Sequence, residues 1–333
     1  MGKDLPGKNL LNCPDVFADI GNVNLFDGQQ MIHSEDLEKQ PTELTYKDNY
    51  GVIRHHYLDT RMKASRHQAE FAIFCIENQS GVSNIMPVRD MGYLYSNYSE
   101  QIRWIQQRDR GKGDLHIQEG IGQNQKLVPV VSMVLYYGQE PWTGPERLSE
   151  MLELPEEWRG KLAPYIADHP VKVIYLAGQD KGTREKYRSD FRHIVDYLAC
   201  MGDVEESRRY IQDTGRKICH PEEYLDMMAE FSSDRRFSEI KENVLKRLGE
   251  GEEEITMFSI AEELENIGKQ KGIEQGAALR SREIICSMLD DDQPPELISK
   301  YTKEPLEYVY QVKREVQFVG EKTAYVADGG EEK

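Results

Sequence analysis

The 333-residue chain has few cysteines and no long apolar run. Its five cysteines lie far apart and form no CxxC pair, which argues against a disulfide framework and against a zinc site built from cysteine pairs. No run of eighteen apolar residues occurs and the mean hydropathy is -0.69, so we expect no membrane span. The first fifteen residues lack the pattern of a signal peptide, and we expect a cytoplasmic protein.

Positive charge is also in short supply. The chain carries 59 acidic and 42 basic residues, which gives a formal net charge of -17. Because non-specific binding to nucleic acid is driven by neutralising phosphates, such a contact would have to use local basic segments. Two basic segments occur early, at Arg61 to His67 and Gln106 to Lys112, whereas acidic runs at Gly249 to Glu254 and Asp290 to Asp292 lie in the C-terminal part.

The first two thirds of the chain alternate helix and strand signals. Pro14 suits the first turn of a helix through PDVFADIGNVNLF, and Gln29 to Tyr46 is expected to be a connection with a short helical turn. A strand or strand pair is predicted in Gly51 to Ala64. The run Ala69 to Gln79 predicts a central strand, because it is apolar on both faces and therefore needs cover on both sides.

A long helix separates this strand from the next one. An apolar stripe at steps of three and four predicts an amphipathic helix of about five turns that starts near Pro87; its members are Val88, Met91, Tyr95, Tyr98, Ile102 and Ile105. Lys126 to Gly138 is again apolar and β-branched. The order strand, helix, strand predicts that this strand lies parallel to Ala69–Gln79 in one sheet. Val171 to Gly178 is a further predicted strand.

The remainder of the chain is predicted to be mostly helical. Gly268, Gly272 and Gly276 recur every four residues, and glycine costs about 1 kcal/mol in a helix interior, so they predict either a close-packed helix face or a hinge. Residues 281–316 are predicted to form two or three short helices, with a helix-turn-helix as one option. We therefore expect an α/β domain over residues 1–215 and a helical C-terminal region over 216–333, which would serve oligomerisation or partner binding.

Polar residues end the central strand, and a carboxylate lies near them. Asp59 lies at the end of the segment HHYLD, and Glu77, Asn78 and Gln79 close the strand. If the two segments form adjacent antiparallel strands, Asp59 and Glu77 converge at one sheet edge, with Glu77 and Gln79 pointing to one side. Two carboxylates at close range repel each other unless a cation neutralises them. Mg²⁺ suits such a site, because it accepts one or two carboxylates and fills its other positions with water and phosphate oxygens.

Other residues could complete such a metal site. The backbone carbonyl of Asn78 lies between the strand-end side chains, and Asp19 or Asp15 of the first helix could add an outer carboxylate. The alternative is structural: an acidic residue at a strand end is commonly solvated or paired with a cation. Four cations are available for such pairs, namely Arg54, Arg61, Lys63 and Arg89. Spacing alone leaves both interpretations open.

Three segments resemble the Rpn-type family of recombination-promoting nucleases and putative transposases, a branch of the PD-(D/E)xK nuclease superfamily. They are Pro14 to Ile32 (PDVFADIGNVNLFDGQQMI), the pair IENQS and MPVRDMGY between Ile76 and Tyr93, and Leu127 to Leu152 (LVPVVSMVLYYGQEPWTGPERLSEML). Their order and approximate spacing are similar to those of the family. The resemblance covers roughly the first two thirds of the chain.

The resemblance implies a restriction-endonuclease-like core of order αβββαβ with a mixed sheet, and Mg²⁺-dependent (or Mn²⁺-dependent) endonuclease chemistry on DNA. Asp59 would match the first metal-binding aspartate and Glu77 the acid of the (D/E)xK triplet, with Gln79 at the lysine position. Glutamine orients groups only by hydrogen bonds, whereas lysine brings positive charge. Arg89 or Lys126 could supply that charge, although Arg89 could instead form a surface ion pair with Asp90 or Glu100.

Two functions follow from these observations. The first is a metal-dependent DNA endonuclease linked to recombination or mobile elements, without a membrane partner and with a homo-oligomer formed through the helical C-terminal region. The second is a catalytically weak or inactive regulatory protein on a nuclease scaffold, which the glutamine and the acidic charge would suit. A transposase of the RNase H type would need a third carboxylate on a later helix and a different order of strands.

Overall fold

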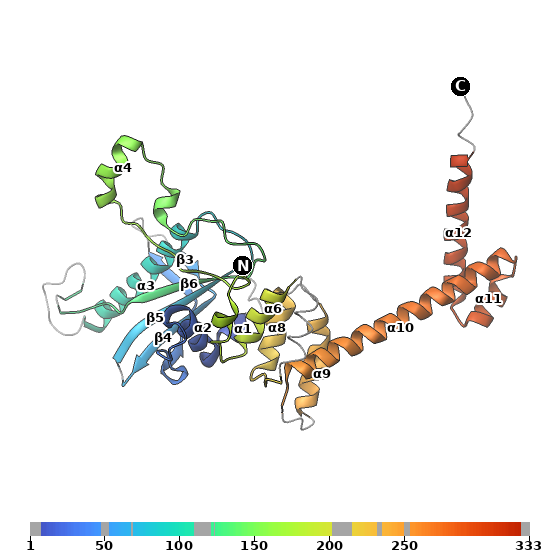
Figure 1. Ribbon diagram of the computed structural model, residues 1–333, viewed down its shortest axis with the longest axis horizontal. Coiled ribbons are helices and arrows are strands. Elements are labelled where there is room, and N and C mark those ends of the chain that lie inside the picture. The colour runs from blue at the N-terminus through green and yellow to red at the C-terminus, as the bar shows by residue number, and fades with distance from the viewer. Residues whose placement is uncertain are drawn as a thin grey trace. The chain divides into compact units, whose positions relative to one another are not determined.

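The structure is a computed structural model that describes residues 8–47, 53–67, 69–109, 121–122, 124–201, 215–231, 235–249 and 254–327 (Figure 1). The chain divides into two compact units, residues 1–261 and 262–333. Helices α8 (Pro221–Phe231) and α9 (Arg236–Gly249) lie in the first unit. The expected division of functions near residue 215 stays a prediction.

A five-stranded mixed sheet forms the centre of the first unit. Its strand order is β1-β4-β5-β6-β7, and its members are β1 (Leu37–Lys39), β4 (Thr60–Arg66), β5 (Ala69–Gln79), β6 (Val130–Tyr136) and β7 (Val173–Tyr175). The β1–β4 and β4–β5 pairs are antiparallel, whereas the β5–β6 and β6–β7 pairs are parallel. The parallel pairing of β5 with β6 confirms the predicted crossover.

The core elements follow the order αβββαβ. They are α2 (Pro14–Phe26), β1, β4, β5, α3 (Met86–Asp109) and β6. A two-stranded sheet of β2 (Glu43–Lys47) and β3 (Ile53–Tyr57) is inserted between β1 and β4. The predicted strand pair in 51–64 is thus divided between two sheets. The connection expected over 29–46 contains the short helical turn η1 (Ser34–Asp36), but it also contains β1 and β2.

Helices cover both faces of β5. Asn97 of α3 donates a hydrogen bond of 3.8 Å to the Cys75 sulfur, which places α3 on the face of the odd-numbered residues. On the other side of the sheet, Asn24 of α2 donates a hydrogen bond of 2.8 Å to the Tyr187 hydroxyl. Tyr187 lies next to Tyr137, whose hydroxyl donates to Asn78. Phe74, Cys75 and Ile76 are all buried, as the apolar pattern on both faces predicts.

The orientation of α3 differs from the predicted one. Val88, Met91 and Tyr95 were expected to face the core, but they are exposed, with Tyr95 at 56%. The buried face carries Asp90, Ser96 and Asn97 together with apolar residues that include Met86, Tyr93 and Ile105. The prediction was therefore wrong for the first half of this helix. The part of the sheet beneath that half ends in polar side chains, so the polar face of the helix turns toward it.

The remaining helices of the first unit pack beyond the sheet. They are α1 (Lys8–Leu11), α4 (Glu156–Leu162), α5 (Lys181–Arg184) and α6 (Phe191–Cys200), with single turns η2 (Leu148–Met151) and η3 (Ala163–Tyr165), besides α8 and α9. The carboxylate of Asp190 accepts the backbone N–H groups of Cys219 and His220 at 3.0 and 2.7 Å. This contact ties the start of α8 to the start of α6.

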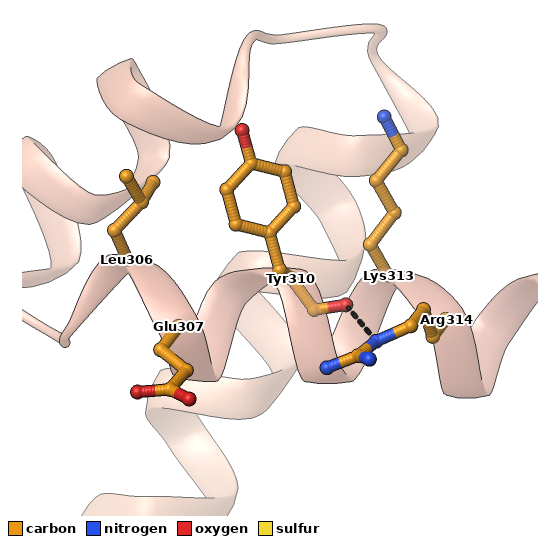
Figure 2. Close-up of a pocket in the computed structure, with 5 residues that line it drawn as sticks. All are labelled: Leu306, Glu307, Tyr310, Lys313 and Arg314. Carbon is orange, nitrogen blue, oxygen red and sulfur yellow. Dashed lines mark hydrogen bonds between the residues drawn. The ribbon is translucent and has the colours of Figure 1, made fainter.

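The second unit is helical. Helix α10 (Met257–Asp290) enters it and is followed by α11 (Pro295–Thr302) and α12 (Leu306–Ala327). Gly268, Gly272 and Gly276 lie inside the unbroken α10, and a Cβ atom added to any of them would meet nothing within 4 Å. Within the described residues, the glycines therefore belong to a continuous helix and to a face that no other side chain or backbone covers. A hollow of about 640 Å³ runs along the first turns of α12 (Figure 2). None of the described helices is long and apolar enough to cross a membrane.

Candidate active site at the ends of β4 and β5

The register of β4 and β5 brings the two predicted acids together. Thr60, the first residue of β4, pairs with Ile76; Asp59 directly precedes Thr60 and Glu77 directly follows Ile76. The backbone N–H of Asn78 donates a hydrogen bond of 2.7 Å to Asp59 Oδ2. Asp59, at the start of β4, and Glu77, near the end of β5, therefore lie at the same edge of the sheet.

Glu77 is buried beneath α3 and accepts hydrogen bonds from two side chains. Its side chain is only 6% exposed, and its Oε1 atom accepts hydrogen bonds from Gln79 Nε2 at 3.1 Å and from the guanidinium of Arg89. Arg89 also donates to the hydroxyl of Tyr93 at 3.0 Å. Because a buried carboxylate needs a partner, the ion pair with Arg89 compensates for the burial of Glu77.

The titration properties of the cluster follow from this geometry. Burial lowers the pKa of Arg89, but the charge of Glu77 and the contacts with Tyr93 outweigh it, so the pKa of Arg89 lies above its usual value. Burial, reinforced by the nearby Glu77 carboxylate, raises the pKa of Tyr93 to about 12. Arg89 is thus cationic and Tyr93 is a neutral phenol at any physiological pH.

Asn78 faces the opposite side of the sheet from Glu77. Its Oδ1 atom accepts a hydrogen bond of 3.1 Å from the Tyr137 hydroxyl, and burial followed by the charge of Asp59 holds the pKa of Tyr137 well above its usual value. The backbone N–H of Tyr137 donates to Gln79 O at 2.9 Å, so the peptide groups of Gln79 face β6. By the alternation of backbone hydrogen bonds in a strand, the N–H and C=O of Asn78 face β4 and Asp59.

Other residues named from the sequence lie elsewhere. Asp19 Oδ2 accepts three hydrogen bonds of 2.7 to 2.8 Å, from the backbone N–H groups of Arg188 and Ser189 and from the Ser189 hydroxyl, so Asp19 holds the turn before α6. Asp15 contacts His220 Nε2 at 3.0 Å. Lys126 is exposed and precedes β6, at the other end of that strand from Glu77. Lys126 is therefore not placed to replace the superfamily lysine.

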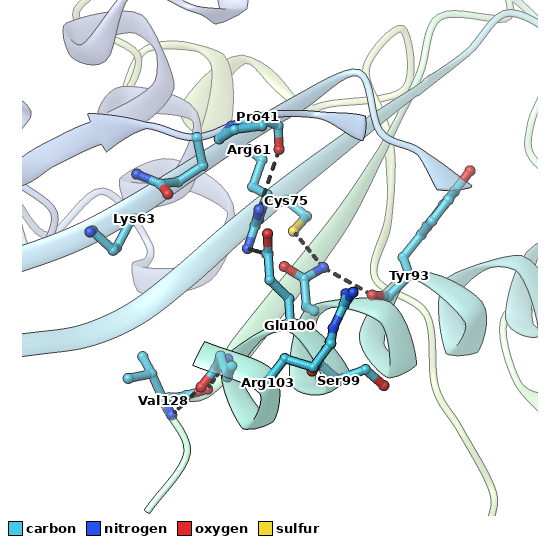
Figure 3. Close-up of polar contacts among 12 residues, drawn as sticks. Pro41, Arg61, Lys63, Cys75, Tyr93, Ser99, Glu100, Arg103 and Val128 are labelled. Carbon is cyan, nitrogen blue, oxygen red and sulfur yellow. Dashed lines mark hydrogen bonds and ion pairs between the residues drawn. The ribbon is translucent and has the colours of Figure 1, made fainter. Parts of the chain in front are cut away.

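The alternative prediction, a surface ion pair of Arg89 with Asp90 or Glu100, is wrong. Asp90 is buried and contacts His169 Nε2 at 2.6 Å, whereas Glu100 pairs with Arg61 at 2.5 Å (Figure 3). The side chain of Arg61 is only 4% exposed and also donates to the Pro41 carbonyl at 3.3 Å. Arg89 turns inward because α3 presents its polar face to the sheet. The four-residue spacing of Arg89 and Tyr93 was the only sequence signal for their contact.

The donors at this edge suit a partial metal site. Among the described residues, no group of three or more His, Cys, Asp or Glu side chains could hold a metal ion, so a cage made entirely of protein ligands does not fit. Two carboxylates, Asp59 and Glu77, with the Asn78 carbonyl facing the same edge, match the ligand set that Mg²⁺ accepts when water and substrate oxygens fill its remaining positions. The residues present therefore fit magnesium or manganese.

The mixed sheet, the αβββαβ order and the acid pair at the ends of β4 and β5 are compatible with a restriction-endonuclease-like fold. Residues 51–181 match the model of the family described as putative transposase, YhgA-like. This match confirms the family resemblance over that stretch, which contains Asp59, Glu77, Gln79 and Arg89. No curated protein and no solved structure matches the chain.

Proposed function

We propose that this protein is a metal-dependent DNA endonuclease that hydrolyses phosphodiester bonds and acts in recombination or in the movement of mobile elements. The observation that supports it most directly is that Asp59, which accepts the Asn78 N–H, lies at the same sheet edge as Glu77, inside the stretch that matches a putative transposase family. An isolated pair of strand-end acids would not suggest this chemistry. The family match and the buried position of Glu77 together make it the function that the site supports best.

Asp59, Glu77 and the Asn78 carbonyl would hold Mg²⁺ or Mn²⁺, which when bound lowers the pKa of a water molecule and stabilises the leaving oxygen of a phosphodiester. The Gln79 amide donates to Glu77 and so fixes the direction of that carboxylate. Gln79 carries no charge, and the cation nearest to Glu77 in the described network is Arg89. We propose that the Arg89 guanidinium takes the part of the missing lysine and stabilises the charge that develops on the phosphate.

Tyr93 would position Arg89 in this scheme. Its hydroxyl accepts a hydrogen bond from Arg89 and remains protonated far above neutral pH, so it can hold the guanidinium without carrying charge itself. Tyr137 supports the site from the other face of the sheet through Asn78. The protein thus contributes two carboxylates, one amide, one cation and two neutral phenols to the proposed site.

The test is cleavage of supercoiled plasmid with Mg²⁺ or Mn²⁺. We expect metal-dependent nicking by the wild type, a loss of at least a hundredfold for Asp59→Ala and for Glu77→Gln, and no change for Glu38→Gln, since the Glu38 side chain is 63% exposed on β1. Absence of metal-dependent nicking by the wild type, or equal cutting by Asp59→Ala, would refute the catalytic proposal.

A second candidate is a regulatory DNA-binding or protein-binding role on the same scaffold, without catalysis. The observation that favours it is the ion pair of Glu77 with Arg89, which already neutralises the buried carboxylate without a metal. This candidate predicts no binding of metal at Asp59 and Glu77. Calorimetric titration of Mn²⁺ into the wild type and into Asp59→Ala separates the two: binding that depends on Asp59 favours the endonuclease.

The helical C-terminal region is proposed to form a homo-oligomer. Helix α10 exposes Gly268, Gly272 and Gly276 together with Leu279, which is 63% exposed, on a helix that nothing within the described chain covers there. Sedimentation of the full chain and of a chain ending after Ala261, the boundary of the first compact unit, tests the assignment. An unchanged oligomeric state in the shorter chain would remove it.

A further inference from the structure

The start of α3 carries a buried carboxylate that the proposed mechanism does not use. Asp90 directly follows Arg89, and its side chain is only 3% exposed. Its Oδ2 atom contacts His169 Nε2 at 2.6 Å, whereas its Oδ1 atom has no hydrogen-bond partner among the described residues. Because an ionised carboxylate can only accept, the Nε2 atom of His169 carries the hydrogen. The burial of Asp90 therefore depends on a side chain from a distant part of the sequence.

His169 is held by two segments that run antiparallel to each other. Arg147 and Pro170 form an antiparallel bridge, and Leu148 N–H donates a hydrogen bond of 3.0 Å to His169 O. The carboxylate of Asp168 accepts a hydrogen bond of 2.6 Å from the guanidinium of Arg147. These contacts close the base of the long connection between β6 and β7. The imidazole is thus held by a support that lies outside α3.

The rotation of α3 about its own axis is opposed by the apolar residues of the helix. Val88, Met91 and Tyr95 are exposed on its outer side. Because burial of apolar surface is favourable, these side chains by themselves favour a rotation that turns them toward the sheet. Polar contacts on the inner side of α3 therefore have to hold the observed rotation. In the first two turns, the charged side chains that make such contacts are Arg89 and Asp90.

The directions of Arg89 and Asp90 are linked. Neighbouring side chains on an α-helix differ in direction by about 100°, because the helix has 3.6 residues per turn. With Asp90 held by His169, the side chain of Arg89 reaches the Glu77 carboxylate on β5. A rotation of α3 that moved Asp90 away from His169 would also move Arg89 away from Glu77. The two ion pairs therefore form or break together.

We infer that His169 is a positioning residue, which acts through Asp90 to fix the rotation of α3 that places Arg89 on Glu77. Its effect on catalysis rests on the proposed function, in which Arg89 stabilises the charge that develops on the phosphate. The coupling between His169 and the Glu77–Arg89 ion pair does not rest on that function, because it is a property of the folded protein without metal or DNA.

A double-mutant cycle in urea unfolding without metal tests this coupling independently of catalysis. It compares the wild type, His169→Ala, Arg89→Met and the double variant. We expect Arg89→Met to lower the folding equilibrium constant about tenfold less in the His169→Ala background than in the wild type, because the ion pair is already displaced there. A purely structural role of His169 would leave the two effects independent. Independent effects, equal within about twofold in the two backgrounds, would overturn the inference.

Two further variants make the cycle specific. His169→Gln keeps an amide donor near the position of Nε2, so we expect it to restore the full effect of Arg89→Met. The matched control is His220→Ala, which removes a contact of the same kind, between His220 Nε2 and Asp15 at 3.0 Å, and should leave the effect of Arg89→Met unchanged. If His169→Ala does not fold, His169→Asn replaces it, because the shorter asparagine does not reach the position of Nε2.

The plasmid-nicking assay measures the consequence for catalysis. We expect His169→Ala to lower kcat about tenfold with an unchanged KM, His169→Gln to keep about the wild-type kcat, and His169→Ala to have no further effect in the Arg89→Met background. An unchanged kcat in His169→Ala, or the same loss in both backgrounds, would overturn the inference. A wild type that does not nick would refute the proposed function alone, and the unfolding cycle would then decide the inference about His169.

Discussion

Replacing Arg89 by methionine removes the guanidinium from Glu77 and keeps most of the apolar length of the side chain. In the variant, the Glu77 carboxylate stays under α3 with a side chain only 6% exposed, next to the like charge of Asp59. Breaking a buried ion pair in this way costs about 3–5 kcal/mol. The Gln79 amide still donates to Glu77 Oε1, so we expect the lower end, about 3 kcal/mol, in the free energy of unfolding without metal.

Metal should reverse most of this loss. A ligand present at a hundred times its Kd stabilises the folded state by about 2.7 kcal/mol, which nearly equals the expected cost. In the wild type, Arg89 already neutralises Glu77, so we expect the gain on adding Mg²⁺ to be smaller than in Arg89→Met. Urea unfolding of both proteins, in EDTA and in saturating Mg²⁺, measures the four free energies needed.

The matched control is Arg103→Met, because Arg103 lies on the exposed face of the same helix. This variant should lower the free energy of unfolding by less than about 0.5 kcal/mol and should leave the stabilisation by metal unchanged. A cost below about 1 kcal/mol for Arg89→Met would show that Glu77 does not depend on this cation. If Mg²⁺ stabilised neither protein, the acid pair would not be a metal site, although the ion pair itself would stand.

Three further predictions concern the rest of the fold. Burial lowers the pKa of His193 to about 4, below the ordinary 6.5, so on acidification the unfolded chain takes up the proton first. The free energy of unfolding should therefore fall by about 3 kcal/mol between pH 6.5 and pH 4. In urea unfolding, His193→Leu should make the free energy of unfolding less dependent on pH over this range. Glu100→Ala leaves the buried Arg61 without its ion-pair partner and should lower the free energy of unfolding by about 3 kcal/mol. Arg61→Met leaves the half-exposed Glu100 in contact with solvent and should lower the free energy of unfolding by only about 1 kcal/mol. Equal losses in the two variants would contradict the difference in burial. If the Gly272 face of α10 is free, Gly272→Ala should stabilise the helix by about 1 kcal/mol, as measured by hydrogen exchange. If that face is packed in an oligomer, the same substitution should weaken self-association, as measured by sedimentation.

The sheet was largely predictable because its evidence is local. Ala69–Gln79 is apolar on both faces, and a long helix separates it from a second strand of the same kind, so the pattern predicted a central strand and a parallel neighbour. The strands β1 and β2 were missed, since three and five residues at the sheet edge and in the inserted hairpin carry too short an alternation to distinguish them from a connection.

The α3 helix shows where the local evidence fails. Its apolar residues Val88, Met91 and Tyr95 predicted the buried face, but they are exposed, and Asp90 and Asn97 are buried instead. A hydrophobic stripe identifies the core side of a helix only if the surface opposite it is apolar. Here the opposing sheet carries Arg61 near its acidic edge, and that is a property of residues far away in the sequence.

The sequence by itself therefore determined which residues end β5 and, through the two-residue alternation of a strand, that Glu77 and Gln79 share a side while Asn78 faces the other. It also determined that Asp59 could reach the same edge if two strands were neighbours. Only the tertiary structure decided that Arg89 pairs with Glu77, that Glu100 pairs with Arg61 and that Asp19 holds the turn before α6. Such partners depend on how a helix is rotated against a sheet, and this rotation is set by the packing of the whole unit.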